Sequence, residues 1–176
     1  MRGHRSRAVV LAAALLAVAS GCGGYRFVRA QESLGSVRRV AVPTLANRSF
    51  EPGLELLVTE ALRREFQRRG AVVVGDPAQA DLVLSGTVLE VHTQSRSFSS
   101  IAFTLEYQVQ MALSLVATRP DGSSIPLDWN AQNEWELYLT SADVEAEKRN
   151  RDEALRRLAA VLAARVHETL AQRLAP

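Results

Sequence analysis

The chain has 176 residues, of which 47% are hydrophobic and 23% are charged. This length suits one domain, and this hydrophobic content excludes a disordered or collagen-like chain. The formal net charge is +2, but removing Arg2, Arg5 and Arg7 at the start of the chain changes it to −1.

Residues 1–21 predict a secretory signal peptide. A basic stretch, 1–7, precedes an almost wholly apolar run, 8–19, and small residues follow that run. The run is shorter than the roughly 20 residues that a membrane-spanning helix needs. Export and the net charge of −1 that remains after the signal both argue against a nucleic-acid partner.

Cys22, the only cysteine, directly follows Gly21. A small residue and then a cysteine at a cleavage site resemble the lipobox of bacterial lipoproteins, in which the cysteine is lipidated. The resemblance implies that Cys22 anchors the chain through a lipidated tether, 22–36, in the outer membrane, facing the periplasm. The alternative for a lone cysteine in an exported protein is a free thiol or an intermolecular disulfide.

The first elements after the tether alternate between strand and helix. A β-rich stretch, 37–44, contains a proline near its end, and 52–69 has apolar residues at helical spacing before the stop signal Gly70. Two strands are then expected, at 71–74 and 81–88.

The clearest period-two pattern covers 103–117, where every second side chain is apolar. A Pro-Asp-Gly turn at 120–122 leads into a hairpin partner, 125–139. A helix then runs from a cap at Thr140 or Ser141 to about Leu174, and a break near Asn150 is left open.

The element order is β-α-β-β-β-β-α. We therefore expect an α+β, two-layer sandwich over residues 37–176, with two helices packed on one face of a four- to five-stranded mixed sheet. The opposite sheet face is expected to be polar and exposed.

No motif for catalysis, metal binding or a cofactor occurs in the sequence. The three histidines have no ligand spacing, and nucleophile elbows, Walker loops and Rossmann glycines are absent. Glu134 and Glu136 share one strand face, and a solvated face explains them more simply than an acid/base pair does. We predict a binding protein that is not an enzyme.

The candidate binding residues are aromatic and basic. Arg96 and Phe98 lie in 95–100, which is either a solvated tip or a contact for an amphiphile, with Arg96 at a phosphate and Phe98 at an acyl chain or partner. Trp129, Trp135 and Tyr138 either pack internally or form a protein interface.

Several segments together resemble the lipopolysaccharide-assembly lipoprotein family LptE. The motif Gly24-Tyr25-Arg26-Phe27 resembles the one that follows the lipid anchor, and 37–43, 54–70 and 105–109 resemble the first strand, first helix and long strand. The C-terminal helix also fits.

The resemblance implies a plug inside a large outer-membrane β-barrel, LptD, that assists barrel assembly and lipopolysaccharide delivery. It also implies lipopolysaccharide binding through basic residues near loop ends, for which Arg96 and Lys148 are the candidates. Phe98, Trp135 and Tyr138 are the candidates for partner binding.

The N-terminal half also resembles α/β modules of other envelope lipoproteins, namely curli-secretion components and activators of peptidoglycan synthases. Those proteins bind protein partners. The long alternating strand at 103–117, followed by a hairpin and one long terminal helix, favours the LptE family.

Overall fold

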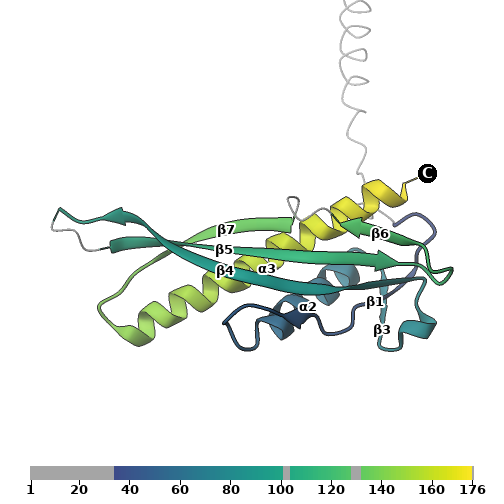
Figure 1. Ribbon diagram of the computed structural model, residues 1–176, viewed down its shortest axis with the longest axis horizontal. Helices are drawn as coiled ribbons and strands as arrows, with labels where there is room; N and C mark the ends of the chain where they lie inside the picture. The colour runs from purple at the N-terminus through teal and green to yellow at the C-terminus, as the bar shows by residue number, and fades with distance from the viewer. Residues whose placement is uncertain (1–33, 101–103, 128–131, 176) are drawn as a thin grey trace, which may run out of the picture. The chain divides into compact units, whose positions relative to one another are not determined.

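Two long strands run the length of the sheet in the computed structural model, which describes residues 34–100, 104–127 and 132–175 (Figure 1). β4 (Leu82–Phe98) and β5 (Thr104–Thr118) pair antiparallel along almost their whole length. The predicted signal peptide, Cys22, the motif at 24–27, Phe103 and Trp129 lie outside the described residues.

The described residues form one mixed sheet with the order β3-β1-β4-β5-β6. Two strands lie outside that order: β2 pairs with β4 alongside β1, and β7 pairs with β5 alongside β6. The bounds of the shorter strands are β1 (Arg39–Ala41), β2 (Ala46–Asn47), β3 (Val72–Val74), β6 (Ser124–Leu127) and β7 (Asn133–Leu139).

The α+β sandwich is confirmed, but the sheet has seven strands rather than four to five. Of the predicted strand at 37–44, only Arg39–Ala41 forms a strand, β1, which ends before Pro43, a residue with no N–H to donate to a strand ladder. β2 follows outside the predicted range. The predicted hairpin partner at 125–139 is divided into β6 and β7, which pair with successive parts of β5.

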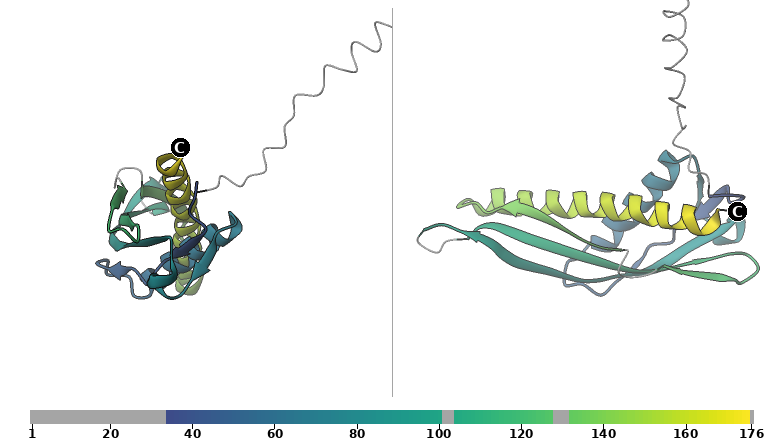
Figure 2. Two further views of the ribbon diagram at one scale, coloured as in Figure 1. Left: turned by 90° about the vertical axis from the view of Figure 1, so that its right-hand side faces the viewer. Right: turned by 90° about the horizontal axis from the view of Figure 1, so that it is seen from above.

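Two helices cover one face of the sheet (Figure 2). α2 (Leu54–Arg68) falls within the predicted 52–69, and a single-turn 3-10 helix, η2 (Pro77–Gln79), follows β3. α3 (Val144–Leu174) is continuous over 31 residues, about 46 Å. Its cap is Asp143, whose carboxylate accepts from the N–H groups of Glu145 and Ala146, and not Thr140 or Ser141.

The core lies between the helices and the inner face of the sheet, the face toward α2 and α3. On β5 the predicted alternation is confirmed from Val109 to Leu115, where the apolar side chains are buried. Gly86 of β4 lies opposite Leu115, and a Cβ there would come 2.1 Å from the carbonyl oxygen of Ser114. The two long strands therefore need glycine at this crossing.

The described chain begins beside the C-terminal end of α3. Leu34, within the predicted tether, is buried, and a Cβ on Gly35 would lie 2.7 Å from the carbonyl oxygen of Leu174. At the other end of α3, the side chain of Asn150 donates to the carbonyl oxygen of Leu139 on β7. The start of the described domain and the far end of the long hairpin therefore lie at opposite ends of α3 (Figure 1).

Candidate interaction surface at the hairpin end

The hairpin end, defined as β4 from Leu89 on, β5 up to Gln110, β7 and the first turns of α3, exposes many apolar side chains. α2 does not extend over this region (Figure 1). Clustered exposed apolar side chains mark interaction sites in globular proteins. The large exposed hydrophobic side chains here are Phe98, Leu105, Trp135, Leu137, Leu139 and Val144.

Three of these side chains form an apolar stripe along β7, made by Trp135, Leu137 and Leu139. They lie opposite the polar side chains of Gln110, Gln108 and Glu106 on β5, so they share the outer sheet face, away from the helices. Trp135 is 54% exposed and Leu139 is 61% exposed. The stripe as a whole was not predicted, although its spacing of two residues is visible in the sequence at 135–139.

Tyr138 points to the opposite, inner face. It is 6% exposed and its ring stacks on that of Tyr107, with centroids 5.4 Å apart. Burial raises the pKa of the Tyr138 hydroxyl. Of the three aromatic residues predicted for partner binding, Phe98 and Trp135 are therefore on the surface and Tyr138 is an internal packing residue.

Glu134 and Glu136 also point toward α3, not into solvent as expected. Glu134 forms an ion pair with Arg165, and the carboxylate of Glu136 accepts from Nε of Arg157 at 2.8 Å. These pairs join β7 to the helix. A structural role explains both carboxylates, and the expectation of a solvated face was wrong.

Arg96 and Lys148 lie at the same end of the molecule. Arg96 is exposed on β4, and Lys148 is exposed near the start of α3. The N–H of Thr140 donates to the carbonyl oxygen of Leu105, which places the segment leading into α3 beside the hairpin. Within the described ranges, neither cationic side chain forms an ion pair or a hydrogen bond, so both are available to an anion.

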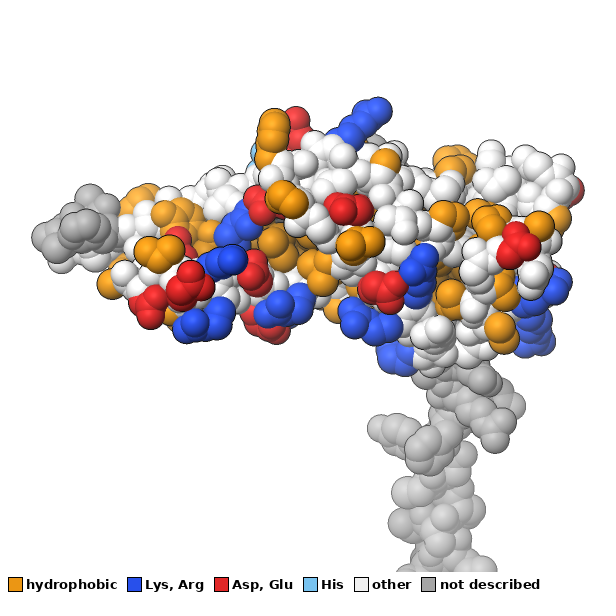
Figure 3. Space-filling view, turned by 90° about the horizontal axis from the view of Figure 1, so that it is seen from below, with side chains coloured by type: hydrophobic (Ala, Val, Ile, Leu, Met, Phe, Trp, Pro, Cys, Tyr) orange, Lys and Arg blue, Asp and Glu red, His pale blue; other side chains and the backbone are white. Residues whose placement is uncertain are grey.

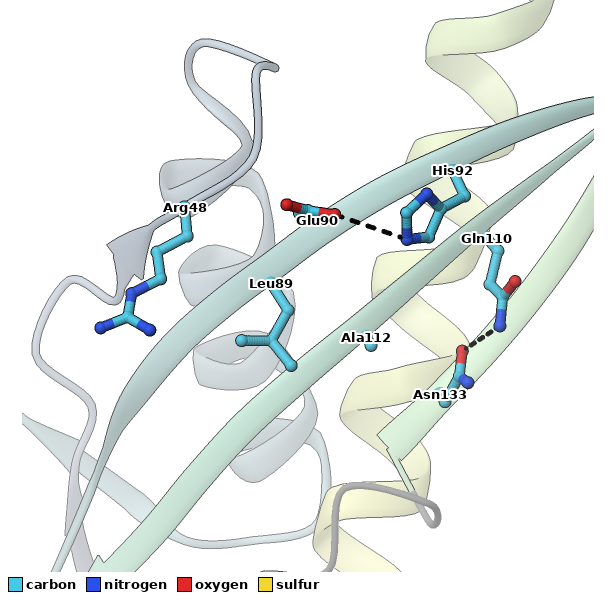
Figure 4. A pocket seen from close by; sticks show the side chains of 7 residues that line it. All are labelled: Arg48, Leu89, Glu90, His92, Gln110, Ala112 and Asn133. Carbon is cyan, nitrogen blue, oxygen red and sulfur yellow. Dashed lines mark hydrogen bonds and ion pairs between the residues drawn. The ribbon is translucent and has the colours of Figure 1, made fainter.

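The outer face also contains a hollow of about 830 Å³ (Figure 4). Its form depends on a β-bulge, since Leu89 and Glu90 together lie opposite Ala112 between the pairs Val88–Leu113 and Val91–Met111. Its lining consists of Arg48, Leu89, Glu90, His92, Gln110, Ala112 and Asn133.

Polar groups surround the small apolar part of this hollow. The carboxylate of Glu90 lies 3.7 Å from Nε2 of His92, and the amide of Gln110 donates to Asn133 at 2.8 Å. Leu89 and Ala112 supply the apolar surface (Figure 4). The arrangement suits contact with a polar partner, and the bulge that creates it could not be located from sequence.

The described residues contain no group of His, Cys, Asp or Glu side chains that could hold a metal ion. None of the helices in this part of the chain has the length and apolar character that a membrane crossing requires. On the face shown in Figure 3, basic and acidic side chains are interspersed, with hydrophobic side chains between them.

A family model described as "LptE: Lipopolysaccharide-assembly" matches residues 37–170. The rare lipoprotein B from Shewanella oneidensis has a similar structure, with a TM-score of 0.55 and 13% identity over 77% of this chain and 96% of that one. An uncharacterized lipoprotein B from Nitrosomonas europaea has a TM-score of 0.50 and 13% identity over 80% of this chain and 84% of its own. No curated protein sequence matches the chain significantly.

Proposed function

This chain belongs to the LptE family of lipopolysaccharide-assembly proteins, and we propose that it is an outer-membrane lipoprotein that binds an LptD-type β-barrel. In this proposal it plugs the barrel and assists the passage of lipopolysaccharide to the outer leaflet. The observation that carries the proposal is the exposed apolar stripe of Trp135, Leu137 and Leu139 beside the unpaired cations Arg96 and Lys148.

The two ends of α3 suggest how a plug would be held. Cys22 lies 12 residues before Leu34, and a stretch of that length spans at most about 40 Å when extended. Lipid on Cys22 would moor the end of the domain near Leu174, while the hairpin end lies at the far end of the helix. The apolar stripe would then reach away from the anchor, into the barrel.

The charge pattern suits the interior of such a barrel. The lumen of an outer-membrane barrel is polar, and the exposed surface of this domain carries both signs of charge (Figure 3). A plug of this kind fills the lumen without leaving a broad apolar surface in water. The stripe on β7 is then the local apolar contact with the barrel wall.

Arg96 and Lys148 are the proposed contacts for lipopolysaccharide. Guanidinium and ammonium groups bind phosphate through charge-assisted hydrogen bonds, and neither side chain has an internal partner in the described ranges. Phe98, 57% exposed on β4 near Arg96, offers an apolar surface to an acyl chain.

The full lipidated chain, extracted in detergent, tests the barrel proposal. It should copurify with a large heat-modifiable β-barrel, and the mass of the Cys22 peptide should include the acyl chains. Recovery with cell-wall synthases alone would support the alternative, an envelope adaptor, and an unlipidated Cys22 would remove the anchor.

Binding of purified lipopolysaccharide tests the two cations separately. Arg96→Ala with Lys148→Ala should lower binding at least tenfold, because two charge-assisted contacts are lost. Arg64→Ala is the matched control, since Arg64 is exposed on α2 and has no ion-pair partner in the described residues. Equal binding by both variants would exclude Arg96 and Lys148 as the site.

A further inference from the structure

The two edges of the long hairpin differ in how their backbone groups are used. On the β5 side, β7 pairs with Glu106–Ala112 and β6 pairs with Leu115–Thr118. On the β4 side, β1 pairs with Leu82 and Val83, and β2 pairs with Thr87 and Val88. Beyond Val88, no other described strand pairs with this side of β4.

α3 protects the far edge of the sheet, on β6 and β7. Asn150 and Arg157 donate to the carbonyl oxygens of Leu139 and Leu137, and Arg173 donates to that of Pro126. No described side chain bonds the open edge of β4 in the same way. Native proteins commonly protect such edges with proline, lysine or a covering element, because an open edge pairs with other chains.

The open edge has a regular part with a bulge at each end. The five residues from Val91 to Ser95 pair with β5 in unbroken register, from Met111 to Tyr107. Register shifts flank them, at Leu89 and Glu90 on one side and at Arg96 on the other. The regular part contains no proline, lysine or arginine, and Thr93 is its centre.

The charges on this edge are arranged symmetrically about Thr93. Glu90 and Arg96 each lie three residues from it, and both side chains are exposed. In an antiparallel pair of two such edges centred on Thr93, Glu90 of each copy lies opposite Arg96 of the other. Opposite charges at facing positions stabilise a strand pair, and like charges destabilise it.

We propose that the open edge of β4 pairs antiparallel with the same edge of a second copy of this chain, about a twofold axis at Thr93. The occupant is a second copy because this chain supplies both the extended backbone and the complementary charges in the register that the bulges impose. Two-fold interfaces are self-complementary in this way. One strand pair is a small interface, so the association is weak and reversible. The same hairpin end is proposed to enter the barrel, so this pairing is a property of the chain outside the barrel, and it does not depend on barrel binding.

A cysteine at the axis gives a direct test in the full exported chain. Residues directly opposite in an antiparallel pair have Cα atoms about 4.5–5.5 Å apart, which is within the range of a disulfide. Thr93→Cys in the full chain, purified away from the barrel, should therefore form an intermolecular disulfide under oxidising conditions. Ser124→Cys is the matched control, because Ser124 is also exposed on a strand, β6. The parent chain, which contains Cys22 alone, measures any disulfide dimer that forms through that residue.

At least tenfold more disulfide dimer with Thr93→Cys than with Ser124→Cys supports the pairing. Equal yields, or no dimer at residue 93, overturn it. Thermal unfolding of each variant under reducing conditions verifies that the domain is folded before the yields are compared.

Charge exchange then tests the register in the Thr93→Cys background. Because of the twofold axis, the dimer contains two pairs of residues 90 and 96. Glu90→Arg alone or Arg96→Glu alone places like charges opposite each other in both pairs, and each should lower the dimer yield roughly tenfold. The double exchange restores both attractive pairs and should restore the yield. A double variant that stays as low as the single ones contradicts this register.

Discussion

The two ends of this molecule are built from the same sheet but are covered differently. At the core end, where β1, β3 and the first part of β4 meet α2 and α3, side chains such as Leu62 and Leu84 are fully buried. At the hairpin end, α3 alone follows the strands, and Trp135, Leu137 and Leu139 remain exposed (Figure 1). Burial at one end and exposure at the other separate the part that stabilises the fold from the part that is free to bind.

The difference arises from the lengths of the two helices. α2 has 15 residues, about 23 Å, whereas α3 has 31 residues and β4 has 17. A strand of 17 residues extends about 56 Å, so α2 can cover less than half of it. The apolar alternation of β5 continues beyond this cover, and Leu105 on the inner face is 46% exposed as a result.

The largest effect is expected from the centre of the core end. Phe66→Ala should lower the free energy of unfolding by about 3–5 kcal/mol, because a buried ring is removed and a cavity is left. Phe66 is 0% exposed and its ring lies 5.4 Å from that of His167 on α3. Urea unfolding followed by circular dichroism measures the change. Phe50→Ala is the control, since Phe50 is 95% exposed, and a similar loss in both variants would contradict the division into two ends.

The next effect concerns the crossing of the two long strands. Gly86→Ala should lower the free energy of unfolding by about 1–3 kcal/mol, because the added Cβ meets the backbone of β5 and forces the strands apart. Gly75→Ala should change it little, since nothing lies within 4 Å of a Cβ there. The same urea experiment applies. Equal free energies of unfolding for the two variants would contradict the prediction and show that the backbones of β4 and β5 can move apart here without loss of stability.

Much of the core end could be predicted from the sequence because its patterns are local. The helical spacing that ends at Gly70 located α2, and the alternation along 103–117 located β5 and its buried face. The end of β1 at Ala41 and the separate strand β2 at 46–47 depend on where each segment finds a partner on β4. That partner is distant in sequence, so the strand count was underestimated.

The hairpin end was less predictable because pairing between distant segments decides which face is buried. Glu134 and Glu136 were expected to face solvent. Each instead forms an ion pair with an arginine of α3 that lies 21 or more residues later in the sequence. Tyr138 was grouped with Trp135 by composition, but the two lie on opposite faces of β7. The bulge at Leu89 and Glu90 depends on the register with β5, which local sequence does not encode.

A smaller, pH-dependent effect is expected where β1 joins β4 at the core end. Asp81 accepts from the guanidinium of Arg39 and from the backbone N–H groups of Arg39 and Arg38. These bonds, that of the Arg39 side chain first, lower the pKa of Asp81 to about 2 from its ordinary 3.8. A lowered carboxyl pKa stabilises the fold above pH 3.8, and that contribution is lost as the pH falls from about 4 to 2.

Asp81→Asn should therefore lower the melting temperature at pH 7, and the gap between parent and variant should close as the pH approaches 2. Thermal unfolding at about pH 7, 4, 3 and 2 measures this difference in melting temperature. Asp152→Asn controls for loss of one negative charge, since the Asp152 carboxylate has no bonded partner in the described ranges. A gap that stays constant across this range would show that the carboxylate is not the stabilising group.

The smallest effect on stability is expected at the hairpin end, together with the largest effect on binding. Trp135→Ser with Leu139→Ser should change the free energy of unfolding by less than about 0.5 kcal/mol for each substitution, because both side chains are already largely in water. Recovery of the β-barrel with the full lipidated chain should nevertheless fall at least tenfold, since exposed aromatic and aliphatic anchors dominate protein interfaces. Val72→Ser is the matched control: Val72 is a 58% exposed strand residue at the core end, and its loss should leave barrel recovery unchanged. If the Val72 variant loses the barrel while the β7 variant keeps it, binding belongs to the core end, and the exposure of the β7 stripe has a different cause.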